Sequence, residues 1–278
     1  MKLGFYDSGL GGLSVLKEFI AKYGSKYSYV YFGDSARAPY GTKSPEQLKS
    51  YVLEIADFMQ EKQVDVLVSA CNSSSMYLDQ IDFVDYFFQV ISLNDVLTKY
   101  FATNQFDKPV ALIATQATID SGRYKNWSVD IHPVACTDLV PLIEAGKLEE
   151  AKANWQTHLK NLPEAITDVI IGCTHYSFLV EARHPAKQSF ASDVDTKKVG
   201  TVLSTSSVSK EQGDLRVKST NDYNFIDPAK LVLEQFASSI FDDGLLNYQT
   251  KDKDLDIDVH FSKADARYLE FVTSLLED

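Results

Sequence analysis

Short apolar runs alternate with stretches of helical spacing along most of the chain. A continuous apolar run predicts a buried strand, and apolar residues three or four positions apart predict a helix with one buried face. Ser44 and Gln47 have the spacing of a capping box at the start of one such helix. The predicted strands are residues 3–6, 29–32, 64–69, 109–114 and 168–171, and the predicted helices are residues 13–22, 45–61, 119–126, 148–162, 231–240 and 264–276. Strands that alternate with helices are typical of the α/β class with a mostly parallel sheet.

The pattern of the first half is repeated in the second half. Residues 64–72 (VDVLVSACN) and residues 168–175 (DVIIGCTH) each contain an apolar strand, a small residue, a cysteine and then polar residues. This likeness indicates two related α/β domains that face each other. Residues 184–222 break the pattern, because they are polar and longer than most connections in a compact domain. We interpret them as a loop, a lid or a small hairpin formed by residues 200–203 and 215–217.

Composition restricts the class of protein and its partners. The 278 residues are 45% hydrophobic and 24% charged, as in a soluble protein of two modest domains or one large domain. We find no run of the ~20 apolar residues that a membrane helix needs, and Asp7 comes too early for a signal peptide, so we expect a cytoplasmic protein. The net charge of −12 argues against nucleic acid and anionic membranes as partners. It leaves room for a small anionic substrate held by backbone N–H groups.

Two of the three cysteines, Cys71 and Cys173, stand out by their positions. A lone cysteine is most often a small buried residue, and we interpret Cys136 as structural in that sense. Cys71 and Cys173 each follow a buried strand and precede a polar turn, where a helix N-terminus would lower the pKa of a thiol. His175 is near enough in sequence to relay a proton for Cys173. Two cysteines and one histidine without a CxxC pair are a poor zinc pattern, so we expect no metal.

Residues 7–14 (DSGLGGLS) form a glycine-rich turn between a predicted strand and a predicted helix. Gly9 and Gly11 fit the first two glycines of a dinucleotide fingerprint, and Asp34 falls where a ribose-binding acid belongs. Ser14 occupies the position of the third glycine. A nicotinamide-dependent oxidoreductase is therefore one alternative, and a plain turn is another. Asp7, at the end of a strand, is placed either for function or for helix capping.

One thiolate and one thiol on opposite sides of a substrate carbon suit the inversion of a stereocentre. The thiolate removes a weakly acidic proton, and the thiol delivers a proton to the other face. The matched cysteines of the two halves permit this chemistry.

Several motifs resemble those of the glutamate racemases in the aspartate/glutamate racemase superfamily. The opening motif is residues 7–16 (DSGLGGLSVL), and the long second motif is residues 31–44 (YFGDSARAPYGTKS). The two cysteine motifs are residues 70–73 (ACNS) and 172–176 (GCTHY), and further similar segments are residues 114–119 and 139–144. The resemblance covers residues 1 to about 180. The sequence departs from the family pattern at Ser73 and Ser74, where the family usually has threonine and then a small residue.

The resemblance implies two similar doubly wound α/β domains with mostly parallel sheets and an active site in the cleft between them. We expect residues 1–93 and 229–278 to form the first domain, and residues 94–228 to form the second, with a polar insertion near residues 184–222. The implied activity is cofactor-independent racemisation of glutamate, from L to D, for bacterial peptidoglycan. The implied partner is a small amino-acid substrate, and a homodimer is consistent with the family.

The resemblance also implies roles for individual residues. Cys71 and Cys173 would be the acid/base catalysts, without pyridoxal phosphate or a metal. Asp7 and His175 would assist them, and Glu144 would orient His175. The residues that would hold the amino acid are Ser8, Pro39, Tyr40, Gly41, Asn72, Ser73, Thr118 and Thr174. The alternatives are a racemase for aspartate or another amino acid, and a non-catalytic binding protein with the racemase fold.

Overall fold

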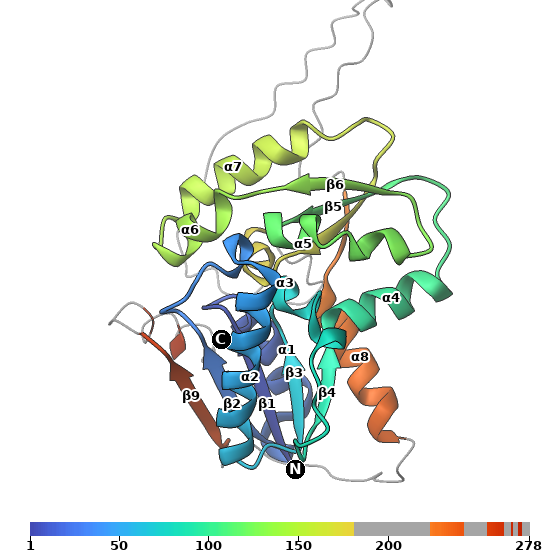
Figure 1. Cartoon of the computed structure of the whole chain (residues 1–278). Helices are drawn as coiled ribbons and strands as arrows, with labels where there is room; N and C mark the ends of the chain where they lie inside the picture. The colour runs from blue at the N-terminus through green and yellow to red at the C-terminus, as the bar shows by residue number, and fades with distance from the viewer. Residues whose placement is uncertain (181–222, 242–254, 264–267, 269–271, 274–278) are drawn as a thin grey trace, which may run out of the picture.

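The computed structural model describes residues 1–180, 223–241, 255–263, 268 and 272–273. Its strands form two separate parallel sheets, one in each lobe of the molecule (Figure 1). The first sheet has the order β4-β3-β1-β2-β9, and the second has the order β6-β5-β7-β8. The first-sheet strands are β1 Lys2–Asp7, β2 Ser28–Gly33, β3 Val66–Ser69, β4 Gln89–Ser92 and β9 Ile257–Phe261. The second-sheet strands are β5 Val110–Ala114, β6 Ile131–Ala135, β7 Asp168–Gly172 and β8 Asn224–Ile226.

Helices cover both faces of the first sheet, so the predicted α/β class with mostly parallel sheets is confirmed. Alternate residues of β1 point to opposite faces: Leu3 and Phe5 join the apolar cluster of α1 and α8, whereas Tyr6 joins the cluster of α2. The α-helices are α1 Leu13–Tyr23, α2 Pro45–Glu61, α3 Asn72–Ser75, α4 Leu93–Thr103, α5 Gln116–Asp120, α6 Leu139–Glu144, α7 Leu148–Lys160 and α8 Pro228–Phe241. Short 3-10 helices are η1 Gly24–Lys26, η2 Tyr40–Thr42, η3 Leu78–Gln80, η4 Arg123–Asn126 and η5 Thr174–Leu179.

Local sequence signals explain where several helices begin and end. Ser44 caps α2 in the predicted capping box: its Oγ accepts a bond from the Gln47 N–H, and the Gln47 side chain accepts one from the Ser44 N–H. The predicted helix over 119–126 is wrong in its bounds. The α-helix ends at Asp120, and Gly122 then takes a φ of 63°, a left-handed conformation that starts a separate 3-10 turn.

The chain returns to the first lobe after β8. Helix α8 packs against α1 and α4, and β9 pairs in parallel with β2. The domain boundaries at 93/94 and 228/229 stay predictions. The proposed hairpin at 200–203 and 215–217 lies outside the described residues, as does most of the predicted helix over 264–276.

Candidate active site

The carboxyl ends of strands from both sheets meet between the lobes. Asp7 ends β1, Cys71 follows β3, Thr115 follows β5 and Cys173 follows β7. In open parallel sheets, ligands bind outside this edge of the strands. The two sheets therefore present their functional edges to each other.

The Asp7 carboxylate joins the two lobes. It is fully buried and accepts hydrogen bonds from the Gly9 N–H (3.0 Å) and from Oγ1 of Thr174 in the second lobe (3.0 Å). Burial raises the pKa of Asp7, although the charge of His175 acts in the opposite direction. Ser8, next to it, is also buried.

The glycines of the turn after β1 allow the second lobe to approach closely. A Cβ on Gly11 would lie 2.4 Å from His175 Nδ1 and 2.4 Å from Thr174 Oγ1. A Cβ on Gly9 would lie 2.0 Å from Glu144 Oε1. These side chains fill the space that a pyrophosphate needs in a dinucleotide-binding turn, which argues against the oxidoreductase alternative.

Cys173, His175 and Glu144 form a chain of hydrogen bonds. Cys173 Sγ lies 3.8 Å from His175 Nδ1, and His175 Nε2 lies 2.5 Å from Glu144 Oε1. Burial alone would lower the pKa of His175, but the hydrogen bonds and charges of Cys173 and Glu144 raise it well above its usual value. Burial opposes ionisation of Glu144, but the bond and charge of His175 outweigh it and hold the Glu144 pKa below its usual range. The structure thus favours an imidazolium between a sulfur and a carboxylate.

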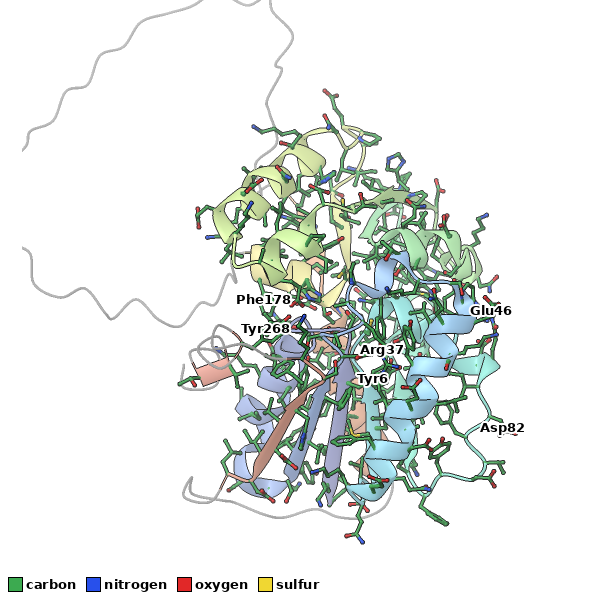
Figure 2. The ribbon with its side chains drawn as sticks, turned by 60° about the vertical axis from the view of Figure 1, so that its left-hand side comes forward. Tyr6, Arg37, Glu46, Asp82, Phe178 and Tyr268 are labelled. Carbon is green, nitrogen blue, oxygen red and sulfur yellow. The ribbon has the colours of Figure 1, made fainter. Side chains whose placement is uncertain are left out.

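Glu144 is also held from two other directions. Its Oε1 accepts a bond from the Leu10 N–H (2.9 Å), and its Oε2 accepts one from the hydroxyl of Tyr268. Tyr268 lies between the lobes in Figure 2. The carboxylate that is hydrogen-bonded to His175 is therefore also held by the turn after β1 and by Tyr268.

Cys71 is buried at the N-cap of α3, and burial raises the pKa of its thiol to about 12, with a further contribution from the Asp7 charge. The expectation that a helix N-terminus lowers this pKa is wrong. Helix α3 is only four residues long, and loss of solvent around the thiol outweighs its backbone donors. Cys71 is therefore held as a thiol at neutral pH.

Asn72 has a buried side chain whose Oδ1 and Nδ2 find no hydrogen-bond partner among the described residues. Buried amides almost always have partners, so this one is free to receive a ligand. Its neighbour Ser73 bonds to Thr115 Oγ1 across the lobes (2.8 Å), and Thr115 Oγ1 lies 3.1 Å from Thr118 Oγ1. The structure brings these polar groups to the same edge as the cysteines.

The loop that carries Pro39, Tyr40 and Gly41 is anchored by buried Asp34. The carboxylate accepts bonds from Tyr40 Oη (2.5 Å), Arg37 Nε (2.5 Å) and Ser262 Oγ (2.8 Å). Because the Tyr40 hydroxyl is engaged by Asp34, the backbone is the part of Tyr40 that remains for a substrate. A Cβ on Gly41 would lie 2.7 Å from Thr115 Cβ, so this loop also contacts the second lobe.

All predicted site residues lie along this meeting edge or in the loop beside it. Sequence reasoning missed Thr115 and Tyr268, and it considered Asp34 as a ribose-binding acid only within the oxidoreductase alternative. Thr115 had a usable signal, because it directly follows a buried strand. Tyr268 had none, because its contact with Glu144 spans 124 positions. Cys136 also follows a strand, β6, at the carboxyl end of the second sheet, and its side chain packs in the apolar cluster of α6 and α7.

A family model described as Asp/Glu/hydantoin racemase matches residues 13–190 of the chain. The chain belongs to this family. This racemase is 37% identical over 185 residues to the glutamate racemase of Aquifex aeolicus. The aligned region covers 64% of this chain and 72% of that relative. It is 38% identical over 186 residues to the glutamate racemase of a Picosynechococcus species. That alignment covers 64% of this chain and 66% of the relative.

Solved structures of glutamate racemases resemble this racemase along its whole length. The enzyme from Thermus thermophilus, solved with β-chloro-D-alanine, gives a TM-score of 0.68 at 28% identity and covers 99% of this chain and 91% of its own. The enzyme from Francisella tularensis, solved with D-glutamate, gives a TM-score of 0.72 at 22% identity. The superposition covers 100% of this chain and 94% of that enzyme. The second likeness shows the fold alone.

The predictions of an amino-acid racemase and of its two α/β domains are confirmed by these comparisons. Among the residues that the structure describes, none of the helices of this racemase has the length and apolar character needed to cross a membrane.

Proposed function

We propose that this racemase interconverts L- and D-glutamate by proton transfer between Cys71 and Cys173, without pyridoxal phosphate or a catalytic metal. The observation that carries the proposal is that both thiols follow buried parallel strands, β3 and β7, at facing sheet edges. The charge of Cys173 is near enough to raise the pKa of Cys71. Two such thiols on opposite sides of one carbon meet the requirement for inversion.

The proposed step balances its protons. The thiolate of one cysteine takes the proton from the α-carbon, and the electron pair delocalises into the α-carboxyl group. The thiol of the other cysteine then donates its proton to the opposite face. The cysteines end with exchanged protonation states. In this proposal Cys71 is the first proton donor, because burial raises the pKa of its thiol, and Cys173, whose Sγ lies 3.8 Å from His175 Nδ1, is the first base.

Neighbouring groups assist each cysteine in this proposal. Asp7 lies close enough to influence the Cys71 thiol, and His175 contacts Cys173 directly. Glu144 orients His175 and keeps it charged. Hydroxyl, amide and backbone groups hold the carboxylates of the amino acid, which explains how an acidic chain binds an anion. These groups belong to Ser8, Pro39, Tyr40, Gly41, Asn72, Ser73, Thr118 and Thr174.

Glutamate is the substrate favoured by the relatives at 37–38% identity, all of which are glutamate racemases. Aspartate is the second candidate, because an aspartate racemase from Picrophilus torridus shares the fold with a TM-score of 0.59 at 12% identity. We further propose that the product, D-glutamate, supplies peptidoglycan synthesis and that the enzyme acts as a homodimer in the cytoplasm.

The test is incubation with L-glutamate, and separately with D-glutamate, in deuterated water without added cofactor. NMR should show α-deuterium incorporation together with loss of chirality. Cys71→Ala and Cys173→Ala should abolish racemisation, whereas Cys136→Ala, which removes the thiol that has no role in the proposed proton transfer, should retain it. Racemisation of aspartate but not of glutamate would show that aspartate is the substrate. Absence of exchange with both amino acids in the folded wild-type protein would favour a non-catalytic binding role and refute the proposal.

A further inference from the structure

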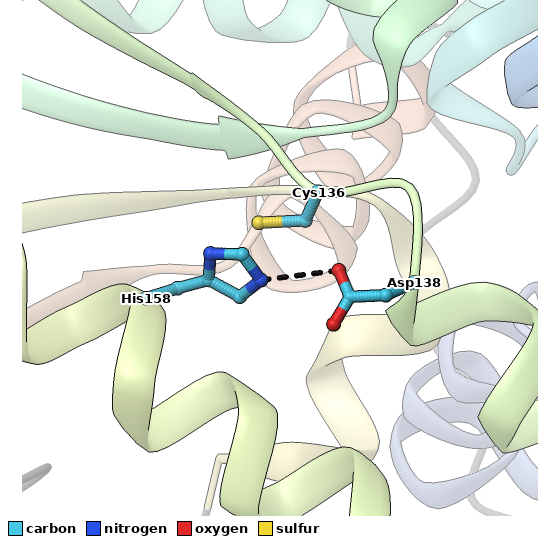
Figure 3. Close-up of side chains that lie close together, drawn as sticks. All are labelled: Cys136, Asp138 and His158. Atoms are coloured by element: carbon cyan, nitrogen blue, oxygen red, sulfur yellow. Dashed lines mark hydrogen bonds and ion pairs between the residues drawn. The ribbon is translucent and has the colours of Figure 1, made fainter.

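Three side chains that can each bind a metal converge in the second lobe, between the end of β6 and helices α6 and α7 (Figure 3). Cys136 follows β6, Asp138 precedes α6, and His158 lies in the last turn of α7. One ligand atom from each residue lies within 4.8 Å of the other two. His158 Nε2 lies 3.1 Å from Asp138 Oδ1. None of these residues has a part in the proposed proton transfer.

We propose that Cys136, Asp138 and His158 bind one thiophilic divalent cation of the Zn²⁺ class. A thiolate, an imidazole nitrogen and a carboxylate oxygen are the ligands that Zn²⁺ takes in proteins. Tetrahedral Zn²⁺ with bonds of about 2.0–2.3 Å separates its ligand atoms by roughly 3.3–3.8 Å. The three atoms therefore need side-chain movements of about 1 Å to close on an ion. A solvent molecule would take the fourth position.

The surroundings of the cluster suit an ion that arrives from solvent. Cys136 is 1% exposed, and its thiol has no hydrogen-bond partner in the described part of the chain. Asp138 and His158 are partly exposed, with side-chain exposures of 38% and 26%, so they form the open side. Asn154 Nδ2 donates to Asp138 Oδ2 (2.8 Å), which orients the carboxylate and leaves Oδ1 for the ion. Partners of this kind strengthen metal ligands.

The charges balance on binding. Cys136 gives up its thiol proton to solvent and binds as a thiolate, and His158 binds through a neutral nitrogen. The thiolate and the Asp138 carboxylate then offset the two positive charges of the ion. Because the ion displaces the thiol proton, affinity should increase with pH.

The ion would tie three elements together. Cys136, Asp138 and His158 come from the segments of β6, α6 and α7, and the Cys136 carbonyl accepts a bond from Tyr176 Oη (2.7 Å) beside the catalytic edge. We assign the ion a structural role, because none of its three ligands is among the residues proposed to act on or hold the substrate. Bound metal should raise the melting temperature of the second lobe by mass action.

The test is titration of the whole metal-free protein with Co²⁺, followed by the thiolate-to-cobalt charge-transfer absorbance, and with Zn²⁺ in competition. We expect one ion per chain. Cys136→Ser should remove the thiolate band, and His158→Gln should weaken binding roughly tenfold or more, since even the loss of an outer partner costs that much. His132→Gln, on the neighbouring strand β6, is the matched histidine control and should bind normally.

A second comparison separates this site from the catalytic thiols. The Cys71→Ser/Cys173→Ser double variant should keep the band and the Zn²⁺-dependent rise in melting temperature. Loss of the band in that double variant, its persistence in Cys136→Ser, or absence of binding to the wild-type protein would overturn the proposal. The Asp138→Asn variant, which keeps the volume of the side chain, should fold and bind more weakly.

Discussion

A single carboxylate, Glu144, helps to keep His175 charged in the candidate site. It accepts bonds from His175 Nε2, from the Leu10 N–H and from the Tyr268 hydroxyl, and it is the partner that keeps His175 charged. The Leu10 bond comes from the opposite lobe. A change at this one residue should therefore alter both the acid/base behaviour of His175 and the fit of the lobes.

Glu144→Gln should lower the pKa of His175 toward its unperturbed value of about 6.5. A raised folded-state pKa stabilises the fold at pH values below about 6.5, and this stability is lost as pH rises through the folded value. The alkaline decline of kcat/KM, and of the free energy of unfolding, should therefore begin at lower pH in the variant. NMR titration of the imidazole and urea unfolding across pH measure both. An unmoved alkaline decline would contradict this account of His175.

Gly11→Ala should reduce kcat/KM by about 100-fold, the cost expected when catalytic groups move by about 1 Å. The new Cβ would lie 2.4 Å from atoms of His175 and Thr174, so the lobes must separate. Gly122→Ala is the control, because it adds strain at a φ of 63° but contacts only the Lys125 side chain at 3.9 Å. It should cost stability with little change in steady-state kinetics. Equal kinetic losses in both variants would point to a general folding effect.

At the scale of elements, the strands that sequence patterns missed are edge strands. β4 and β9 flank the first sheet, and β6 and β8 flank the second. Each is half-exposed and carries polar residues, such as His132 in β6 and Asp258 in β9. Edge strands need not bury both faces, so they lack the continuous apolar run that identified β3 and β7.

The same reasoning explains what was predictable in the site. The positions of Asp7, Cys71 and Cys173 follow from the local pattern of strand and turn. The roles expected of the site residues came from the resemblance of the motifs to those of the racemase family. The raised pKa of Cys71 was not predictable, because it depends on burial and on the Asp7 charge. The cluster around Cys136 was also hidden, since His158 lies 20 positions from Asp138 and no short motif joins them.

Ser44→Ala tests the capping box of α2, the helix that follows the Asp34 loop. The change removes the bond from the Gln47 N–H to Ser44 Oγ. Loss of an N-cap costs about 1 kcal/mol of unfolding free energy, measurable by urea denaturation. Ser44→Asp should restore most of it, because aspartate is also a good cap. A stability unchanged by the alanine substitution would show that the cap contributes nothing here.

At the scale of the whole molecule, the C-terminal segment completes the first lobe. β9 pairs with β2, and Ser262 donates to Asp34 Oδ1 and accepts from the Ala36 N–H (2.9 Å). Asp34 in turn anchors the loop that contributes Pro39, Tyr40 and Gly41. In our proposal this loop holds the substrate, so its geometry depends on a residue 228 positions after Asp34.

Ser262→Ala should raise KM several-fold with a smaller change in kcat, because it loosens the loop that holds the substrate and leaves the cysteines in place. It should also cost about 1–3 kcal/mol of stability by leaving a buried carboxylate oxygen without a partner. Thr157→Ala removes an exposed hydroxyl that bonds within α7 and serves as the control. Steady-state kinetics and urea unfolding provide the two measurements. A fall in kcat alone would contradict the positioning role.

The pairing of Asp34 with Ser262 also has a consequence for synthesis on the ribosome. The two residues are 228 positions apart, so at about 5–20 residues per second the first is made roughly ten to fifty seconds before the second. During that interval one edge of β2 has no neighbour, and the loop of residues 39–41 lacks the anchor that Ser262 provides through Asp34. A nascent chain thus exposes an unpaired strand edge that chaperones can recognise, and this loop becomes fixed only after Ser262 has been made.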